Sequence, residues 1–312
     1  MIYCMDMAHV IVLGGGTSSE RAVSLRSASA VAAALQTAGH TVTFIDPSEN
    51  FLRQKSAVKK ADVVFPALHG TGGEDGTLQS ILDKWSVAYV GAGADSSSLC
   101  FDKASYKALL AAHSISTAPG ALVSIDLLWN MPLSEHPFVL KPVDGGSSID
   151  THIIRDPVHA DRQAIAESLS RHQTMLMEKL ISGTEITVAV IGKHALPVVE
   201  IIPPTDGEFD YENKYNGKTQ ELCPPLHVTE AVQRKAQRLA EKIHKICGCR
   251  DLSRTDFIVT PEGKPVPLET NTLPGMTNES LVPKAALAEG TSMPQLCDRL
   301  VQLALQRKNA KQ

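Results

Sequence analysis

Residues 252–272 read LSRTDFIVTPEGKPVPLETNT, and this stretch predicts a β-hairpin. Residues 253–260 are typical of a strand, residues 261–264 form a Pro-Glu-Gly-Lys turn, and residues 265–271 are typical of a return strand. A turn centred between positions 262 and 263 sets which residues of the two strands lie opposite each other. Because side chains alternate between the two faces of a strand, this register also predicts which of them share a face.

Four polar side chains share one face of the predicted hairpin. Asp256 lies opposite Glu269, and Arg254 lies opposite Asn271. The other face carries two further expected pairs, Thr255 with Thr270 and Phe257 with Leu268.

Two carboxylates that face each other across a strand pair repel, unless a cation lies between them. Asp256, Glu269 and the amide oxygen of Asn271 are hard oxygen ligands, which suit a magnesium ion that also bridges substrate phosphates. The alternative is a solvated acidic face without metal, and a register slip of one residue would turn every side chain to the opposite face.

The N-terminal part of the chain alternates between strand and helix patterns, which predicts a parallel sheet with helices on its faces. The expected strands are 9–13, 40–46, 61–68 and 87–91, and the expected helices are 19–37 and 77–85.

Two further segments follow, and the chain is expected to be α/β with α+β elements in three domains, 1–93, 94–180 and 181–312. In the second segment we expect a helix at 96–113 and strands at 137–141, 151–155 and 174–180. In the third we expect strands at 185–191 and 196–202, a polar loop at 205–225, an amphipathic helix at 230–247 and a final helix after Ser292.

Composition excludes several classes of protein. The chain has 312 residues, with 30 Lys and Arg against 34 Asp and Glu, and 4% aromatic residues, which argues against a nucleic-acid-binding protein. It has no apolar run long enough to span a bilayer and no signal-peptide pattern at its start, so we expect no membrane partner. Its six cysteines show no Cys-x-x-Cys spacing, which favours reduced thiols in the cytoplasm.

Candidate phosphate-binding residues lie in the second segment, although the chain lacks the Gly-x-x-x-x-Gly-Lys-Ser/Thr string. The Gly/Ser loop 144–148 follows the strand that ends in Lys141, and its N–H groups could turn toward an anion. Lys103, inside the expected helix 96–113, is a second candidate cation. The alternatives are a plain turn and a solvated helix lysine.

The glycines at 14–16 follow the first strand and resemble part of a dinucleotide-binding fingerprint, which makes a dehydrogenase an alternative. However, Ser19 replaces the third glycine, and the carboxylate of Glu20 would repel a pyrophosphate but attract an ammonium group. His69 follows the third strand, where ligands favour the strand ends, although a local hydrogen bond explains it equally well.

Taken together, these motifs resemble the D-alanine–D-alanine ligases of the ATP-grasp family. The matching strings, in chain order, are 15–25, 65–70, 73–77, 102–103, 140–142, 146–148, 178–179, 183–185, 209–215, 254–257, 269–277 and 280–283. Their joint order along nearly the whole chain is more specific than any single string.

The resemblance implies a three-domain ATP-grasp architecture that begins with a parallel-sheet domain, and it implies a role for each matching residue. The expected ATP-binding residues are Lys103, Lys141, Glu178, Lys179, Ile181, Glu185 and Lys214. The expected ligands of two Mg²⁺ (or Mn²⁺) ions are Asp256, Glu269 and Asn271. The expected catalytic residues are Glu20, Ser147, Tyr215, Arg254 and Gly275, and the expected substrate-binding residues are His69, Ser280 and Leu281.

The implied activity is the ATP-dependent joining of two D-alanine molecules through an acyl phosphate, for peptidoglycan precursors. The resemblance also implies a homodimer in the cytoplasm. The alternatives are a ligase of the same fold that takes D-serine or D-lactate second, and a non-catalytic nucleotide-binding protein. Two residues depart from the family's pattern: Asp150 stands where relatives have glycine and would add negative charge near the phosphates, and Thr270 replaces an apolar residue, which should matter little.

Overall fold

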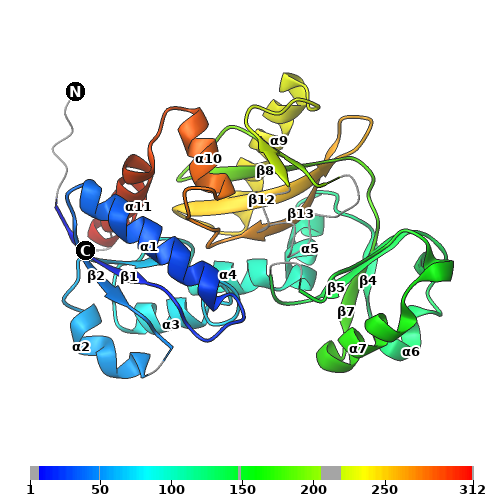
Figure 1. Ribbon diagram of the computed structural model, residues 1–312, viewed down its shortest axis with the longest axis horizontal. Coiled ribbons are helices and arrows are strands. Elements are labelled where there is room, and N and C mark those ends of the chain that lie inside the picture. The colour runs from blue at the N-terminus through cyan, green and yellow to red at the C-terminus, as the bar shows by residue number, and fades with distance from the viewer. Residues whose placement is uncertain (1–6, 49, 147–148, 205–218, 311–312) are drawn as a thin grey trace.

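The computed structural model describes residues 7–48, 50–146, 149–204 and 219–310. Its strands form three sheets, one in each third of the chain, and helices cover their faces (Figure 1). No helix in these ranges combines the length and apolar character that crossing a membrane requires. The five described cysteines are all free thiols.

The first sheet is parallel, as the alternating pattern predicts. Its strand order is β2 (Thr41–Ile45), β1 (His9–Leu13) and β3 (Val63–Pro66). The expected strand at 87–91 contributes only an isolated bridge from Tyr89 to Val64. The helical elements of this part are α1 (Arg21–Thr37), η1 (Phe51–Gln54), α2 (Lys55–Val58) and α3 (Thr77–Lys84).

The end of the chain returns to the first sheet. Helix α11 (Met293–Asn309) packs against α1, and α10 (Leu281–Ala288) packs against α11 (Figure 1); all three contribute to one hydrophobic core. The predicted capping box at the start of α11 is present, because Ser292 and Gln295 each bind the other's backbone. The two chain ends therefore build one body around the first sheet.

The second sheet is antiparallel, with the order β4 (Gly120–Val123), β7 (Met175–Lys179), β5 (Phe138–Pro142) and β6 (His152–Ile154). Sequence analysis did not predict β4. The helical elements on this sheet are α6 (Ile125–Leu128), η2 (Pro132–Glu135), η3 (Pro157–His159) and α7 (Arg162–His172).

The single helix expected at 96–113 is wrong, because two helices occupy these residues: α4 (Ala94–Phe101) and α5 (Lys103–Ala112). Asp102 between them is extended, and its side chain accepts a hydrogen bond from Ser105 N at 2.6 Å. An N-cap of this kind starts a new helix. Lys103 is consequently the first residue of α5 and does not lie in the middle of a helix.

The third sheet is the largest, and all of its pairings are antiparallel. Its strands in spatial order are β11 (Gln220–Leu222), β10 (Val199–Ile202), β8 (Thr184–Ile191), β12 (Leu252–Val259) and β13 (Pro265–Asn271), with β9 (His194–Ala195) paired to β8. Helices α9 (Glu230–Ile246) and α5 pack on this sheet in a common core.

The predicted hairpin is present as β12 and β13, and its register is confirmed where the charged residues lie. Arg254 pairs with Asn271, Thr255 with Thr270, and Asp256 with Glu269.

The predicted pairing of Phe257 with Leu268 is wrong, because a bulge pairs Phe257 with Pro267 instead. Prolines at 265 and 267 donate no ladder hydrogen bond, and an irregular strand tolerates them best. The bulge brings Leu268 and its neighbour Glu269 to the same cavity.

Candidate active site

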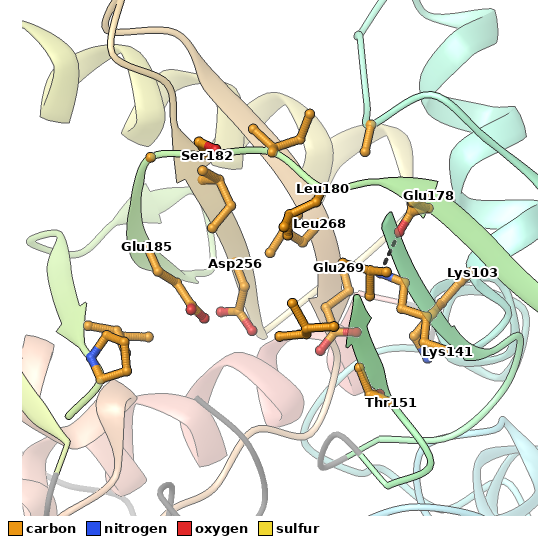
Figure 2. Close-up of a pocket in the computed structure, with 18 of the residues that line it drawn as sticks. Lys103, Lys141, Thr151, Glu178, Leu180, Ser182, Glu185, Asp256, Leu268 and Glu269 are labelled. Carbon is orange, nitrogen blue, oxygen red and sulfur yellow. Dashed lines mark ion pairs between the residues drawn. The ribbon is translucent and has the colours of Figure 1, made fainter. Parts of the chain in front are cut away.

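A cavity of about 550 Å³ lies between the second and third sheets (Figure 2). Strands β5 and β7 supply one wall, and β10, β12 and β13 supply the other. The predicted ATP-binding residues that line it are Lys103, Lys141, Glu178, Lys179, Ile181 and Glu185. Residues that sequence analysis did not name, including Leu180 and Leu268, provide apolar surface in the same cavity.

Glu178 binds two lysines at one end of this cavity. Lys141 Nζ lies 2.7 Å from Glu178 Oε2, and Lys107 forms an ion pair with the other oxygen. Burial opposes ionisation of Glu178, but the two ammonium groups hold its carboxyl pKa below its ordinary value. Sequence analysis missed Lys107, whose position on α5 becomes relevant only once α5 packs beside β7.

Lys103 is buried at the start of α5. Its Nζ donates to Gly145 O at 2.7 Å, so it touches the glycine-containing loop that sequence analysis paired with it. Burial, together with the neighbouring Lys141, lowers the pKa of Lys103. Two lysines therefore lie beside this loop, which is the arrangement that a polyphosphate needs.

Arg254 and Asp256, on β12, form a two-bond ion pair. Arg254 Nε lies 2.9 Å from Asp256 Oδ1, and Nη2 lies 2.8 Å from Oδ2. Thr187 Oγ1 on β8 donates to Asp256 Oδ1 at 2.5 Å. Burial opposes the positive charge of Arg254, but the Asp256 and Glu269 carboxylates raise its pKa above the ordinary value.

The donor set fits a metal that ATP helps to bind. Asp256 and Glu269 both line the cavity, and Figure 2 shows their carboxylates directed into it. Asn271 Oδ1 accepts from Leu273 N at 2.8 Å, which leaves that oxygen a second lone pair. Within the described ranges no three His, Cys, Asp or Glu side chains are placed to hold a metal by themselves. Magnesium sites commonly consist of one or two carboxylates completed by phosphate oxygens, so these residues suit that ion.

The residues predicted to bind the amino acids come from the first sheet and from the chain segment before α10. His69 is buried, and its ring nitrogens lie 3.0 Å from Ser27 Oγ and 3.1 Å from Leu273 O. Burial lowers the pKa of His69 to about 4, so its ring is neutral near pH 7.

Ser280 and Leu281 mark the start of α10. Ser280 Oγ accepts a hydrogen bond from Thr277 N at 3.0 Å, and Leu281 is the first helical residue. A Cβ atom at Gly275 would lie 2.9 Å from Ser280 Oγ, so a side chain at position 275 would crowd this turn. Backbone N–H groups at a helix start are suited to bind a carboxylate.

Three predicted site residues, Ser147, Lys214 and Tyr215, lie outside the described residues. Their predicted roles stay predictions.

The glycine loop after β1 does not have the form that a dinucleotide requires. Gly16 N donates to Asp46 Oδ1 at 3.0 Å, and Gly15 N donates to Ser24 Oγ at 2.9 Å. Arg21 lies 2.6 Å from Asp46. The chain's own side chains thus bind the N–H groups that a pyrophosphate would need, which disfavours the dehydrogenase alternative.

Asp150 does not place its charge among the phosphate-binding lysines. Its carboxylate lies 2.6 Å from Arg171 Nη2 and 2.7 Å from His172 Nε2, at the end of α7. The Arg171 guanidinium, followed by His172, lowers the pKa of Asp150 to about 2, although partial burial opposes this. Ile149 and Thr151 on either side line the cavity, whereas Asp150 is not one of the lining residues. The expectation of added charge near the phosphates is therefore wrong, because α7 supplies cations that draw the side chain away.

Thr270 is part of a buried chain of hydroxyl groups. Its Oγ1 lies 2.8 Å from Thr255 Oγ1 and 2.9 Å from Tyr106 OH on α5. The threonine thus links the hairpin of β12 and β13 to α5, a contact that the local sequence pattern does not predict.

Comparisons with known proteins agree with this geometry. The family models described as D-ala D-ala ligase N-terminus and C-terminus match residues 47–92 and 131–302. The chain is 40% identical to the D-alanine–D-alanine ligase of Rhizorhabdus wittichii, over 97% of this chain and 98% of that protein.

Solved structures give the same result. The D-alanine–D-alanine ligase of Bacillus anthracis complexed with ATP is similar with a TM-score of 0.81 and 26% identity, over 98% of this chain and all of that chain (100%). The VanG D-Ala:D-Ser ligase of Enterococcus faecalis is similar with a TM-score of 0.79 and 29% identity, over 96% of this chain and 100% of that chain. With one family model covering more than half of its length and a 40% identical relative covering nearly all of it, the chain belongs to the D-alanine–D-alanine ligase family.

Proposed function

We propose that this protein joins two D-alanine molecules into D-alanyl-D-alanine with hydrolysis of ATP to ADP and phosphate, as a step in peptidoglycan synthesis. The observation that carries the proposal is the set of charged groups that share one cavity. The lining residues include Glu178, Glu185, Lys103, Lys141, Asp256 and Glu269 (Figure 2). Glu20 and His69 are buried in the part of the chain that builds the first sheet.

A carboxylate is a poor electrophile, so the first D-alanine must be activated before an amine attacks it. Transfer of the ATP γ-phosphoryl group converts its carboxylate into an acyl phosphate, and Lys103 and Lys141 are suited to bind the phosphate oxygens. Asp256, Glu269 and Asn271 would hold two Mg²⁺ or Mn²⁺ ions. These ions would offset the negative charge of the transferring group.

The amine of the second D-alanine then attacks the acyl carbon, and a tetrahedral oxyanion forms. Arg254 keeps a positive charge in this region, so it is suited to stabilise the oxyanion together with Gly275 N–H. The start of α10 at Ser280 and Leu281 would bind the carboxylate of the second D-alanine. Glu20, at the start of α1, would bind the ammonium of the first.

The retained Arg254–Asp256 pair argues against the non-catalytic alternative. A nucleotide-binding protein needs the lysines at Lys103 and Lys141, but it has no use for a buried arginine beside the carboxylates. D-Serine as second substrate is kept as the alternative, because the similar VanG protein is a D-Ala:D-Ser ligase. D-Lactate is the other alternative to D-alanine as second substrate.

A homodimer, a cytoplasmic location and the division into domains 1–93, 94–180 and 181–312 complete the proposal. The homodimer rests on the family resemblance, and the cytoplasmic location is supported by the free thiols. The three sheets, one in each third of the chain, support the division, except that α10 and α11 of the third segment pack with the first sheet.

One experiment tests the central claim. ADP release is measured in a coupled assay with ATP, Mg²⁺ and D-alanine, and then with D-serine or D-lactate added as acceptor, at two pH values. We expect D-alanine alone to support turnover and D-alanyl-D-alanine to appear in equal amount to ADP. Absence of D-alanine-dependent ADP release would overturn the proposed function, and preference for D-serine would establish the alternative.

A further inference from the structure

The loop after β3 contains a buried carboxyl group with one oxygen that has no hydrogen-bond partner. Glu74 Oε2 accepts from Gly70 N at 2.8 Å, but no group among the residues that the structure describes donates to Glu74 Oε1. Glu74 is 7% exposed. A buried, unpartnered carboxyl oxygen costs stability, so its presence points to a ligand that donates to it.

Glu74 lies beside the residues that would bind phosphate. It lines a small hollow of about 30 Å³ together with Lys103, Gly146 and Glu269, and these three residues also line the large cavity. The hollow therefore adjoins the large cavity at these shared residues. A group bound to Glu74 would lie next to the acyl phosphate.

Glu20 and Glu74 approach the same glycine. A Cβ atom placed on Gly146 would lie 3.6 Å from Glu20 Oε2 and 3.7 Å from Glu74 Oε2. The neighbouring Glu20 carboxylate adds to the effect of burial, and together they raise the pKa of Glu74 to about 8. Two neighbouring carboxyl groups repel when both are ionised, and the Arg254 guanidinium offsets only part of this effect on Glu74.

The reaction proposed above brings two cations that can donate to carboxylates, because each amino acid carries an ammonium group. Glu20 is expected to bind the first of them. We propose that Glu74 is a further catalytic residue, which receives the ammonium of the second, acceptor amino acid and takes its proton. This inference rests on the proposed function.

One N–H bond of the acceptor's ammonium breaks and the proton joins the Glu74 carboxylate, which leaves a neutral amine with a lone pair. That pair forms the N–C bond at the acyl carbon, and the C–O bond to phosphate breaks with its electron pair going to phosphate. The departing phosphate takes the second proton from nitrogen, and Glu74 returns its proton to water when the products leave.

The same contact favours an amino acceptor over a hydroxy acceptor. A bound ammonium group favours the ionised form of Glu74, which is the form that can take a proton, whereas the hydroxyl of D-lactate supplies no positive charge to favour it.

Hydroxylamine separates the two half-reactions. It is a neutral nucleophile near pH 7, so it traps the acyl phosphate as D-alanine hydroxamate without needing a base. For Glu74→Gln we expect hydroxamate formation to stay within about twofold of the unsubstituted protein, while dipeptide formation falls by about 100-fold, the scale of a lost general base. Asp75→Asn is the matched control, because Asp75 lies on the same loop with both oxygens bound to backbone N–H groups, and neither product should change.

Every other outcome overturns the inference. Equal losses of hydroxamate and dipeptide in a folded Glu74→Gln protein would mean that Glu74 serves the first amino acid or the loop, and unchanged dipeptide formation would mean that it has no role. If Glu74→Gln does not fold, Glu74→Asp is measured in the same two assays. The rate of dipeptide formation must then fall more than the rate of hydroxamate formation. Failure of the proposed function is distinguishable, because the unsubstituted protein would then form neither product.

Discussion

Replacement of Asp256 by asparagine tests the metal site and the ion pair together. The Asp256 carboxylate receives two bonds from Arg254 and one from Thr187, and Arg254 is only 15% exposed at its side chain. An asparagine keeps the shape but presents an NH₂ group where one of the acceptor oxygens was. Arg254 is then left partly uncompensated, which costs about 3–5 kcal/mol for a buried pair.

We expect the lower end of that range, because Glu269 and Glu74 also favour the charge of Arg254. A loss of about 3 kcal/mol lowers the melting temperature of a domain of this size by about 6–12 °C. Thr187→Val is the matched control. It removes one hydrogen bond to the same carboxylate, about 1.5 kcal/mol, and leaves the charge and both ligand oxygens in place.

The assay combines thermal unfolding without nucleotide and Mn²⁺ binding in the presence of a non-hydrolysable ATP analogue. Asp256→Asn should lower the melting temperature more than Thr187→Val and should weaken Mn²⁺ binding by more than about tenfold. Thr187→Val should retain Mn²⁺ binding. Equal Mn²⁺ affinity in all three proteins would refute the metal assignment, and equal melting temperatures would refute the energetic role of the Arg254 pair.

Three further predictions concern the remaining features of the site. Asp150→Gly removes the contacts to α7 but also relieves a residue at φ 54°, so we expect stability to change by less than about 1 kcal/mol. Because the contacts to α7 hold the residues on either side, Ile149 and Thr151, at the cavity, the KM for ATP should rise in steady-state kinetics, and an unchanged KM would contradict this. Thr270→Val leaves two buried hydroxyl groups short of a partner and should cost about 1–3 kcal/mol in denaturant unfolding without altering KM. The pKa of Glu74 rises from 4.5 to about 8 on folding, so the folded protein holds a proton that the unfolded chain releases, and this contribution to stability is lost as pH rises through that window. The melting temperature of Glu74→Gln, relative to that of the unsubstituted protein, should therefore rise as pH increases from 5 to 8. A difference between the two proteins that does not vary with pH would contradict the raised pKa.

Local sequence patterns predict the structure correctly where residues close together in the chain decide it. The facing pair of Asp256 and Glu269 follows from turn position and strand alternation, and the structure confirms it. Strand alternation alone does not predict the bulge at Phe257, because it treats the prolines of β13 as ordinary strand residues. The helix break at Asp102 was also missed, although an aspartate before a new helical turn is a known N-cap pattern.

The importance of Glu74 was not visible from the same reading. Its string 73–77 supported the family resemblance, but no local pattern shows that one carboxyl oxygen is buried without a partner. That property arises because Gly146 of the second segment and Glu20 of the first converge on it.

The sequence by itself determined the element types, the family and the chemistry of the charged hairpin, because these depend on residue spacing and on short-range backbone preferences. Only the tertiary structure decided which charges neutralise each other: Lys107 with Glu178, and Arg171 with Asp150, each join residues 21 or more positions apart. Charge pairing depends on distance and burial in three dimensions, and both are properties of how the sheets and helices pack.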